Sequence, residues 1–501
     1  MFGPFVLDRE QMKLMRDGRS VSLGGRGTSL LAALAGAQGG AVTKERLMQA
    51  AWPGTVVEEA NLTVQIAALR RALGAGGDEQ EWIITVPRVG YRLVWPQVAE
   101  SATESGPPAV AVLPFENLSS DPEQSFLADG IVEDIITALS RFKTFAVVAR
   151  NSTFVYKGRA VDVREVARVL GVRYLLEGSV RRSGDRVRVA AQLIEGASGA
   201  HLWAETFDGA VADIFDFQDE ITKSVIGLIE PQIRKAEIER ARRKRPENLD
   251  AWDLYVQALP LVYAADLPGY TVAIGLLDRA IGLDPGYAPA LAFASWAHEK
   301  RTTFGGVLPG IDDVEMSLAL AQRALDADPD DAVAMALLGW QRILFRWDYA
   351  GLALCARAIE LNPNNRAVLD LTAVAHLFAG DLDQVIVCGM RALQLSPGAP
   401  DAYMCLNHIS SAHLAAKRFD EAAKWAERSI DLEKGFVFSH LHLAASYAHL
   451  GRIEEARACM KVARALRPDF TIAFMKARPM RFPERRAPVV EGLRKAGMPE
   501  G

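Results

Sequence analysis

The pattern of hydrophobic and polar positions changes twice along the chain and divides it into three regions. The first region, 1–96, mixes strand-like alternation with helical spacing. The second, 109–245, alternates β-rich runs with helical ones and ends in a long helix, which is typical of an α/β domain. Beyond residue 249 nearly every segment has helical spacing. A polar stretch, 97–108, is predicted to be a linker because it has few apolar side chains to bury.

The first region is predicted to contain three strands, three helices and a hairpin, at 2–7, 11–16, 20–23, 27–36, 43–51, 58–73 and 82–95. Thr43 is expected to cap the second helix, with Arg46 where a complete capping box has glutamate. One stripe of the third helix is apolar and should face the core: Leu62, Ile66, Leu69 and Leu73. The opposite face carries mostly short side chains, so this helix could lie close against a grooved partner.

The third region repeats at an interval close to 34 residues. A polar residue, followed in all but one case by proline, recurs in steps of 44, 34, 34, 37 and 34 at Asp284, Asp328, Asn362, Ser396, Glu433 and Arg467. Four residues before each of them is a small side chain, as two closely approaching helix backbones require: Ala280, Ala324, Ala358, Ala392, Ser429 and Ala463. The period predicts about six tetratricopeptide helix pairs over 250–470. The 44-residue step predicts an insertion near 302–312.

Such repeats stack into a curved solenoid, whose concave face usually binds peptides or other proteins. Self-association through the same array is an equally open interpretation. A tail, 471–501, is predicted to follow the repeats.

Several motifs of the first region resemble the effector domain of OmpR/PhoB-type transcription regulators. They are FGPFVLD at 2–8, DGRSVSL at 17–23, LMQAAWPG at 47–54, LRRALG at 69–74 and ITVPRVGYR at 84–92. Their order and spacing agree with the family over residues 2–95. The resemblance implies a winged helix–turn–helix whose third helix enters the major groove and whose hairpin wing reaches the minor groove.

The resemblance also assigns DNA-contacting roles. On the third helix these fall on Asn61, Thr63, Val64, Gln65, Ala67, Ala68, Arg70 and Arg71, and on the wing they fall on Thr85, Arg88 and Tyr91. Arg71 and Arg88 can neutralise phosphates. Two alternatives remain open, because Arg70 could instead form an intramolecular salt bridge and Tyr91 could belong to the core.

The charge of the first region limits its affinity for DNA. Residues 1–96 hold 11 Lys and Arg against 9 Asp and Glu, a net charge of only +2. Members of the family commonly carry basic residues where this chain has Ala67 and Ala68. We therefore expect modest affinity for each winged helix and a need for paired sites or a homodimer.

The second region resembles the TolB-like α/β domain, through AVLPFEN at 111–117, FLADG at 126–130, LLEGSV at 175–180 and HLWAE at 201–205. This resemblance implies little about activity. No receiver domain is expected before the winged helix, which starts at residue 2, and no membrane helix follows it as in CadC-type regulators. The overall plan is similar to that of HilA-type regulators.

Residues able to support catalysis are sparse. Asp129, Glu133 and Asp134 cluster on one predicted helix and could bind a metal, but a solvated helix face is the favoured interpretation. No phosphate-binding loop, nucleophile elbow or HExxH motif is present in the sequence. We predict no enzymatic activity, and no catalytic, metal-binding or cofactor-binding residue. The basic run 234–245 is interpreted as a solvated helix end, with nucleic-acid or phosphate contact as the alternative.

Composition supports a globular protein: 50% of residues are hydrophobic, 24% are charged, and the net charge is −5. The longest apolar run, 256–265, is too short to cross a membrane, and no signal peptide is expected. The four cysteines are too far apart to predict a disulfide framework or a zinc site, and small buried side chains are expected: Cys355, Cys388, Cys405 and Cys459. The predicted compartment is the cytoplasm.

The sequence therefore predicts a multi-domain chain: a winged helix–turn–helix (α+β) at 1–96, an α/β TolB-like domain at 109–245 and an all-α solenoid at 250–470. The function hypothesis is a one-component transcription regulator. It would bind double-stranded promoter DNA as a homodimer and receive its signal, or a protein partner, through the C-terminal regions. The alternative is a tetratricopeptide scaffold with weak or vestigial DNA binding.

Overall fold

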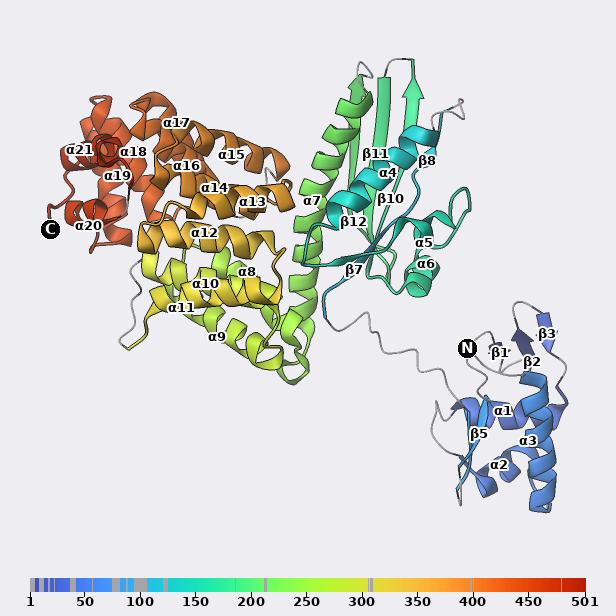
Figure 1. Cartoon of the computed structure of the whole chain (residues 1–501). Coiled ribbons are helices and arrows are strands. Elements are labelled where there is room, and N and C mark those ends of the chain that lie inside the picture. Colours follow the sequence, from blue (N-terminus) through green and yellow to red (C-terminus); the bar gives the residue numbers. More distant parts are fainter. Residues whose placement is uncertain are drawn as a thin grey trace. The chain divides into compact units, whose positions relative to one another are not determined.

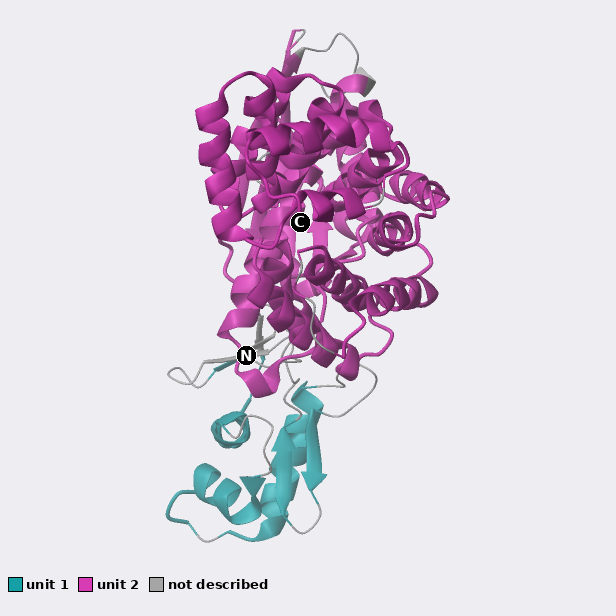
Figure 2. Cartoon of the chain, turned by 90° about the vertical axis from the view of Figure 1, so that its left-hand side faces the viewer, with its two compact units in different colours: residues 1–104 teal, residues 105–501 magenta. Residues whose placement is uncertain are grey.

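The computed structural model divides into two compact units, residues 1–104 and 105–501 (Figure 2). Each unit has hydrophobic core residues of its own. The structure describes residues 5–8, 13–16, 19–21, 23–36, 42–55, 57–73, 82–86, 89–93, 106–119, 125–184, 186–210, 214–304, 306, 310–396, 399, 401–478 and 480–501.

The described residues of the first unit form two small sheets and three helices (Figure 1). The first sheet is antiparallel, in the order β1 (Phe5–Asp8), β2 (Lys13–Arg16) and β3 (Arg19–Val21). The second has the order β4 (Val42–Thr43), β6 (Gly90–Leu93) and β5 (Ile83–Val86). The helices are α1 (Gly25–Gly36), α2 (Lys44–Ala51) and α3 (Glu59–Leu73). The predicted helices and hairpin are confirmed to within two residues at each described end.

The core of this unit follows the predicted pattern. The apolar stripe of α3 is buried, with at most 1% of each side chain exposed: Leu62, Ile66, Leu69 and Leu73. Thr43 caps α2 by accepting a hydrogen bond from the Arg46 amide at 3.4 Å. Strand β4 reaches β6 beside Gly90, where a Cβ would lie 2.1 Å from the Val42 carbonyl oxygen. Only glycine allows the two strands to approach this closely.

The second unit begins with a mixed sheet in the order β12-β11-β10-β7-β9, with β8 beside β10. Its strands are β7 (Ala109–Val112), β8 (Glu116–Asn117), β9 (Ala146–Val147), β10 (Tyr174–Ser183), β11 (Arg186–Glu195) and β12 (His201–Ala210). β7, β8 and β9 form parallel pairs, whereas β10, β11 and β12 form an antiparallel meander. The prediction of alternating α/β structure therefore holds only for the first half of this sheet.

Helices cover both faces of the sheet. Helices α4 (Ser125–Leu139) and α7 (Ile214–Arg243) share one core with the strands, including Ile131, Val189 and Val225. Helix α6 (Val163–Leu170) packs on the other face through Val166, and α5 (Arg150–Phe154) lies close to β7. Helix α7 is 30 residues long and contains Pro231. Its first part belongs to the sheet core up to Ile233, whereas Ala241 belongs to the core of the helical repeats.

Beyond α7 the second unit consists of helix pairs (Figure 1). The pairs are α8 (Ala251–Tyr263) with α9 (Leu267–Leu283), α10 (Ala288–Thr303) with α11 (Asp313–Ala327), α12 (Ala332–Arg346) with α13 (Gly351–Leu361), α14 (Arg366–Ala379) with α15 (Leu382–Leu395), α16 (Ala402–Ala415) with α17 (Phe419–Leu432), and α18 (Val437–His449) with α19 (Ile453–Leu466). The second helix of every pair ends immediately before a predicted repeat position. The six small residues are also at most 2% exposed, so the periodicity is confirmed.

The residues after the last pair are folded. They form α20 (Ile472–Ala477), a 3₁₀ helix (Pro483–Arg486) and α21 (Ala487–Lys495), and α21 packs against α18 and α16. At Gly492 a Cβ would lie 2.6 Å from the Ala445 carbonyl oxygen, so glycine is required at this contact. In the part of the chain that the structure describes, no helix has the length and apolar character needed to span a membrane.

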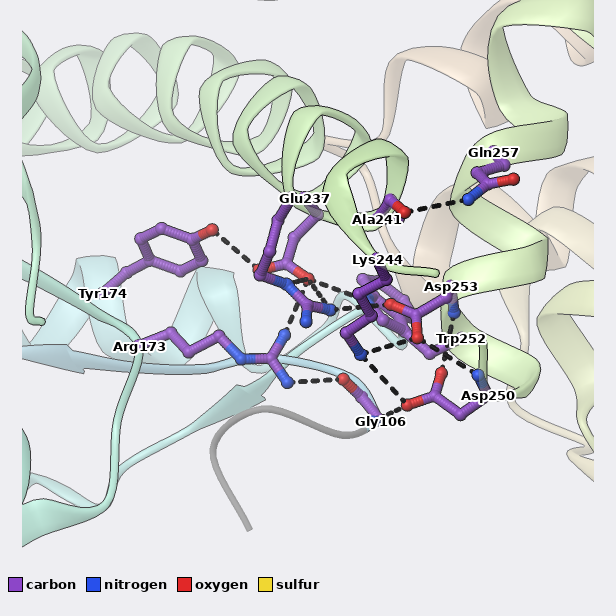
Figure 3. Close-up of polar contacts among 11 residues, drawn as sticks. Gly106, Arg173, Tyr174, Glu237, Ala241, Lys244, Asp250, Trp252, Asp253 and Gln257 are labelled. Atoms are coloured by element: carbon purple, nitrogen blue, oxygen red, sulfur yellow. Dashed lines mark hydrogen bonds and ion pairs between the residues drawn. The ribbon is translucent and has the colours of Figure 1, made fainter. Parts of the chain in front are cut away.

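The basic end of α7 differs from the prediction of a solvated helix terminus. Arg240 pairs with Glu237 at 3.0 Å and with Asp253 at 3.1 Å. Lys244 pairs with Asp253 at 2.6 Å (Figure 3). Only 14% of the Arg234 side chain is exposed. The interpretation as a solvated helix end is therefore wrong for Arg234, Arg240 and Lys244, because acidic residues of α7 and α8 lie beside them.

Candidate nucleic-acid interface

The face of α3 opposite its apolar stripe is accessible. Asn61, Thr63, Ala67 and Arg71 are exposed, and 61% of Val64 is exposed. Gln65 and Ala68 are half-buried at the sides of this face. The side chains of this face that precede Arg71, which lies in the last turn, are short. Another surface can therefore approach the backbone of α3 closely.

Arg70 fastens α3 to the hairpin. Its Nε donates a hydrogen bond of 2.8 Å to the Ile83 carbonyl, and its Nη2 donates one of 3.0 Å to Thr85 Oγ1. The guanidinium is thereby directed along β5. These bonds fix the hairpin relative to the helix, which is a positioning role.

The wing contains one exposed and one buried predicted site residue. Thr85 is exposed on β5, whereas the Tyr91 side chain opposite it on β6 is only 6% exposed and belongs to the core. Arg88 lies outside the described residues. Sequence reasoning missed Arg92, which is exposed on β6 and adds a positive charge to the hairpin. Its position in the alternating β6 pattern could have indicated this exposure.

The charge along α3 is uneven. Glu58 and Glu59 lie at its N-terminal end, where the helix dipole favours negative charge. Lys44 of α2 forms an ion pair with Glu59. Arg71, in the last turn, donates a long hydrogen bond of 3.5 Å to the Ala67 carbonyl. The positive charge of α3 is therefore concentrated at its C-terminal end.

The acidic cluster of α4 is partly neutralised. Asp129 pairs with Lys157 at 2.6 Å, and Glu133 lies 3.6 Å from Arg150. Burial raises the pKa of Asp134, as do the nearby carboxylates of Asp219 and Glu133. Within the described residues, no group of three or more His, Cys, Asp or Glu side chains is arranged to hold a metal ion.

Residues 18–93 match the family described as "Transcriptional regulatory protein, C terminal". The chain carries the DNA-binding domain of OmpR/PhoB-type regulators. Residues 107–224 match "HilA/YgeH-like transcriptional regulator, second domain", so the middle region is HilA-like. The TolB-like assignment of this region stays a prediction.

Two curated relatives match different shares of the chain. "Transcriptional regulator HilA" of Salmonella paratyphi A (strain ATCC 9150 / SARB42) is 28% identical over 409 residues, which are 79% of this chain and 70% of the relative. "Putative adenylate cyclase 3" of Rhizobium meliloti (strain 1021) is 42% identical over 251 residues, 48% of this chain. The second match spans only 42% of that relative's length.

Among solved structures, the chain is similar to "Crystal structure of YrrB: a TPR protein with an unusual peptide-binding site". The sequence identity is 15% and the TM-score is 0.26. The match covers 38% of this chain and 93% of that structure.

Proposed function

We propose that this protein is a one-component transcription regulator that binds double-stranded DNA through α3 and the β5–β6 hairpin. The observation that carries this proposal is the accessible outer face of α3, held next to the hairpin by Arg70, within a domain of the transcriptional-regulator type. Because its target would be chromosomal DNA, it would act in the cytoplasm.

The DNA-contacting roles divide by position. Asn61 can hydrogen-bond to an adenine edge or a phosphate, and Val64 can contact a thymine methyl group. Arg71 would neutralise a phosphate at the C-terminal end of α3. Flanking or wing contacts are assigned to Thr63, Gln65, Ala67, Ala68, Thr85 and Arg88. Arg70 is hydrogen-bonded to β5 and Tyr91 is buried, which favours positioning roles for these two residues.

Weak individual binding would make pairing necessary. With few basic side chains on α3, each winged helix gains little from phosphate contacts. Two copies on adjacent half-sites gain affinity through effective concentration, so modest changes in association can switch occupancy. We propose a homodimer on DNA.

The signal would enter through the second unit. The sheet region, whose TolB-like assignment remains a prediction, is joined to the first repeat through the Arg240–Asp253 ion pair and the hydrogen bond from Trp252 to Glu237. This junction supports transmission from the repeats to the sheet region. A protein partner or a second copy of the chain on the repeats remains part of the proposal.

Selection of genomic fragments on the purified full chain, at near-physiological salt, tests the function. We expect enrichment of paired short sites, and weaker recovery with Arg71→Ala. Arg71→Ala should weaken binding to all sequences about equally. It should also reduce the slope of the logarithm of the binding constant against the logarithm of salt concentration by about one unit. Arg357→Gln, which changes an exposed arginine of α13, is the matched control. Recovery at background from both proteins would favour the scaffold hypothesis, which the uncharged Ala67 and Ala68 keep open.

A further inference from the structure

A cavity of about 140 Å³ lies among the first helices of successive repeats and the C-terminal segment, residues 471–501. Helices α10, α12, α14, α16 and α18 line it, and Met475 and Arg478 contribute from the C-terminal side. Because a water molecule needs about 10–15 Å³ of such space, the cavity has room for about ten non-hydrogen atoms. This size suits a small molecule rather than a folded or extended peptide.

The C-terminal segment is anchored over this inner side. The Arg481 amide donates a hydrogen bond of 2.9 Å to the Phe378 carbonyl, and His449 Nε2 lies 2.7 Å from the Pro488 carbonyl oxygen. The Arg478 guanidinium lies over the rings of Phe438, at 5.0 Å, and Phe378, at 5.5 Å. The segment thus supplies a wall of the cavity and one of its charges.

Most of the wall is apolar and aromatic, as in small-molecule sites. Six ring side chains, each no more than 8% exposed, contribute to it: Trp296, Phe304, Trp340, Phe378, Phe436 and Phe438. Such a lining favours a ligand with an aromatic or other planar apolar body.

Two cations on this wall lack a carboxylate partner among the described residues. Lys300 is only 4% exposed, and its ammonium contacts the Met404 sulfur at 2.9 Å and lies 5.1 Å from the Trp296 ring centre. In the described part of the chain, no carboxylate oxygen lies within 4.0 Å of the Lys300 or Arg478 side-chain nitrogens. A thioether is a weak acceptor, so among these residues the buried Lys300 side chain lacks the direct ion pair that buried charges normally have. Burial lowers the pKa of Lys300, although the charges of Glu299 and Asp370 act in the opposite direction.

The acidic residues of the cavity are engaged elsewhere. Asp370 lies 2.9 Å from His408 Nδ1, and Glu299 accepts a hydrogen bond of 2.6 Å from Thr303. Burial raises the pKa of Glu299, whereas the nearby charges of Lys300 and Arg478 act in the opposite direction, so Glu299 attracts both cations without a direct ion pair. The cavity therefore presents two cations that have no direct ion pair within the described residues, while its two acidic residues would repel a dianion more than a monoanion.

We propose that this cavity binds a small carboxylate with an aromatic or planar apolar body, its carboxylate facing Lys300 and Arg478. The ligand would neutralise both cations at once and fill the aromatic lining. It would also tie the C-terminal segment to α10 and α14. Ligand binding stands apart from DNA binding, so failure of one leaves the other intact.

Calorimetric titration of the full chain with benzoate tests the site, with benzyl alcohol and phenyl phosphate as neutral and dianionic analogues. We expect benzoate to bind at least about tenfold more tightly than either analogue. Lys300→Met and Arg478→Met should each weaken benzoate binding by about tenfold while changing benzyl alcohol binding little. Lys461→Gln, an exposed position on α19, should behave as wild type.

The thermal unfolding of each protein is measured to show that it is folded. If one of the two cavity variants does not fold, the other is sufficient for the test. We expect Lys300→Met to be at least as stable as wild type, because it removes a buried charge that has no direct ion pair in the part of the chain that the structure describes. Equal binding of benzoate and benzyl alcohol would overturn the proposal. Unchanged benzoate binding in both folded variants, tighter binding of phenyl phosphate, or no benzoate binding up to about 10 mM would do the same.

Discussion

The Trp252 indole donates a hydrogen bond of 2.7 Å to the carboxylate of Glu237, joining the first repeat to the helix that packs on the sheet (Figure 3). The other carboxylate oxygen accepts a hydrogen bond of 2.7 Å from Tyr174 on β10. Arg173 and Arg240 pair with Glu237 at 2.6 and 3.0 Å. These five residues form the Glu237 cluster.

Glu237→Ala should destabilise the second unit strongly. The change leaves Arg173 and Arg240 without this buried counter-charge and removes the acceptor of two buried donors. Loss of one partner from a buried ion pair costs about 3–5 kcal/mol. We expect a drop of that size in the free energy of unfolding, measured by urea denaturation. The exposed neighbour Glu239 gives the control Glu239→Ala, and equal midpoints for the two variants would contradict the expectation.

The Glu237 cluster should also make stability depend on acid. Burial favours a raised pKa for Glu237, but Arg173, Arg240 and the hydrogen bonds from Trp252 and Tyr174 outweigh it and hold the pKa below its ordinary value. The stabilisation is therefore present above the unfolded pKa, about 4.3, and is lost as pH falls through the lower folded value. The difference in melting temperature between wild type and Glu237→Gln should shrink below about pH 4. A constant difference from pH 6 to pH 3 would contradict this.

Arg70→Ala should loosen the wing without removing a major phosphate contact. It deletes the hydrogen bonds to the Ile83 carbonyl and to Thr85. Hydrogen bonds from a charged group contribute about 1.5–3 kcal/mol, so β5 and β6 should open more often. Hydrogen exchange of the full chain should show faster exchange of the β5–β6 amides. Arg71→Ala should leave that exchange unchanged. Identical exchange profiles for wild type, Arg70→Ala and Arg71→Ala would contradict the positioning role of Arg70.

The cysteines should react slowly in the native protein. Burial raises the pKa of Cys355 to about 12, and it also raises the pKa of Cys388, Cys405 and Cys459. Little thiolate exists at neutral pH, and three of the four thiols are buried. Iodoacetamide labelling followed by peptide mass spectrometry should modify the half-buried Cys459 first. Rapid labelling of Cys355 or Cys405 under native conditions would contradict the structure.

The sequence predicted those parts of the fold that local spacing determines. The buried stripe of α3 follows from a 3.6-residue period, and the ends of the repeat helices follow from a polar residue four positions after a small one. Both patterns are set by neighbours within one or two helices. The outer face of α3 could be predicted for the same reason, since it is the complement of that stripe.

Contacts between distant segments could not be predicted in this way. The two-residue strand β4 exists only because β6 pairs with it, and its own sequence has no strand pattern. Arg240 and Lys244 resemble a solvated basic run until Asp253 of the next helix is brought beside them. The partners of Arg70 lie 13 and 15 residues away, so its orientation depended on the hairpin.

Helix α7 supplies side chains to two cores in succession, the sheet core up to Ile233 and the repeat core at Ala241. Recombination that exchanges the sheet region for another one, with a crossover near residue 245, would separate Glu237 and Ala241 from the repeat residues that cover them. A crossover before α7 would instead uncover Ile221 and Val225. The sheet region and the first repeat should therefore be inherited as one piece, whereas exchange of residues 1–104 divides neither of these two cores.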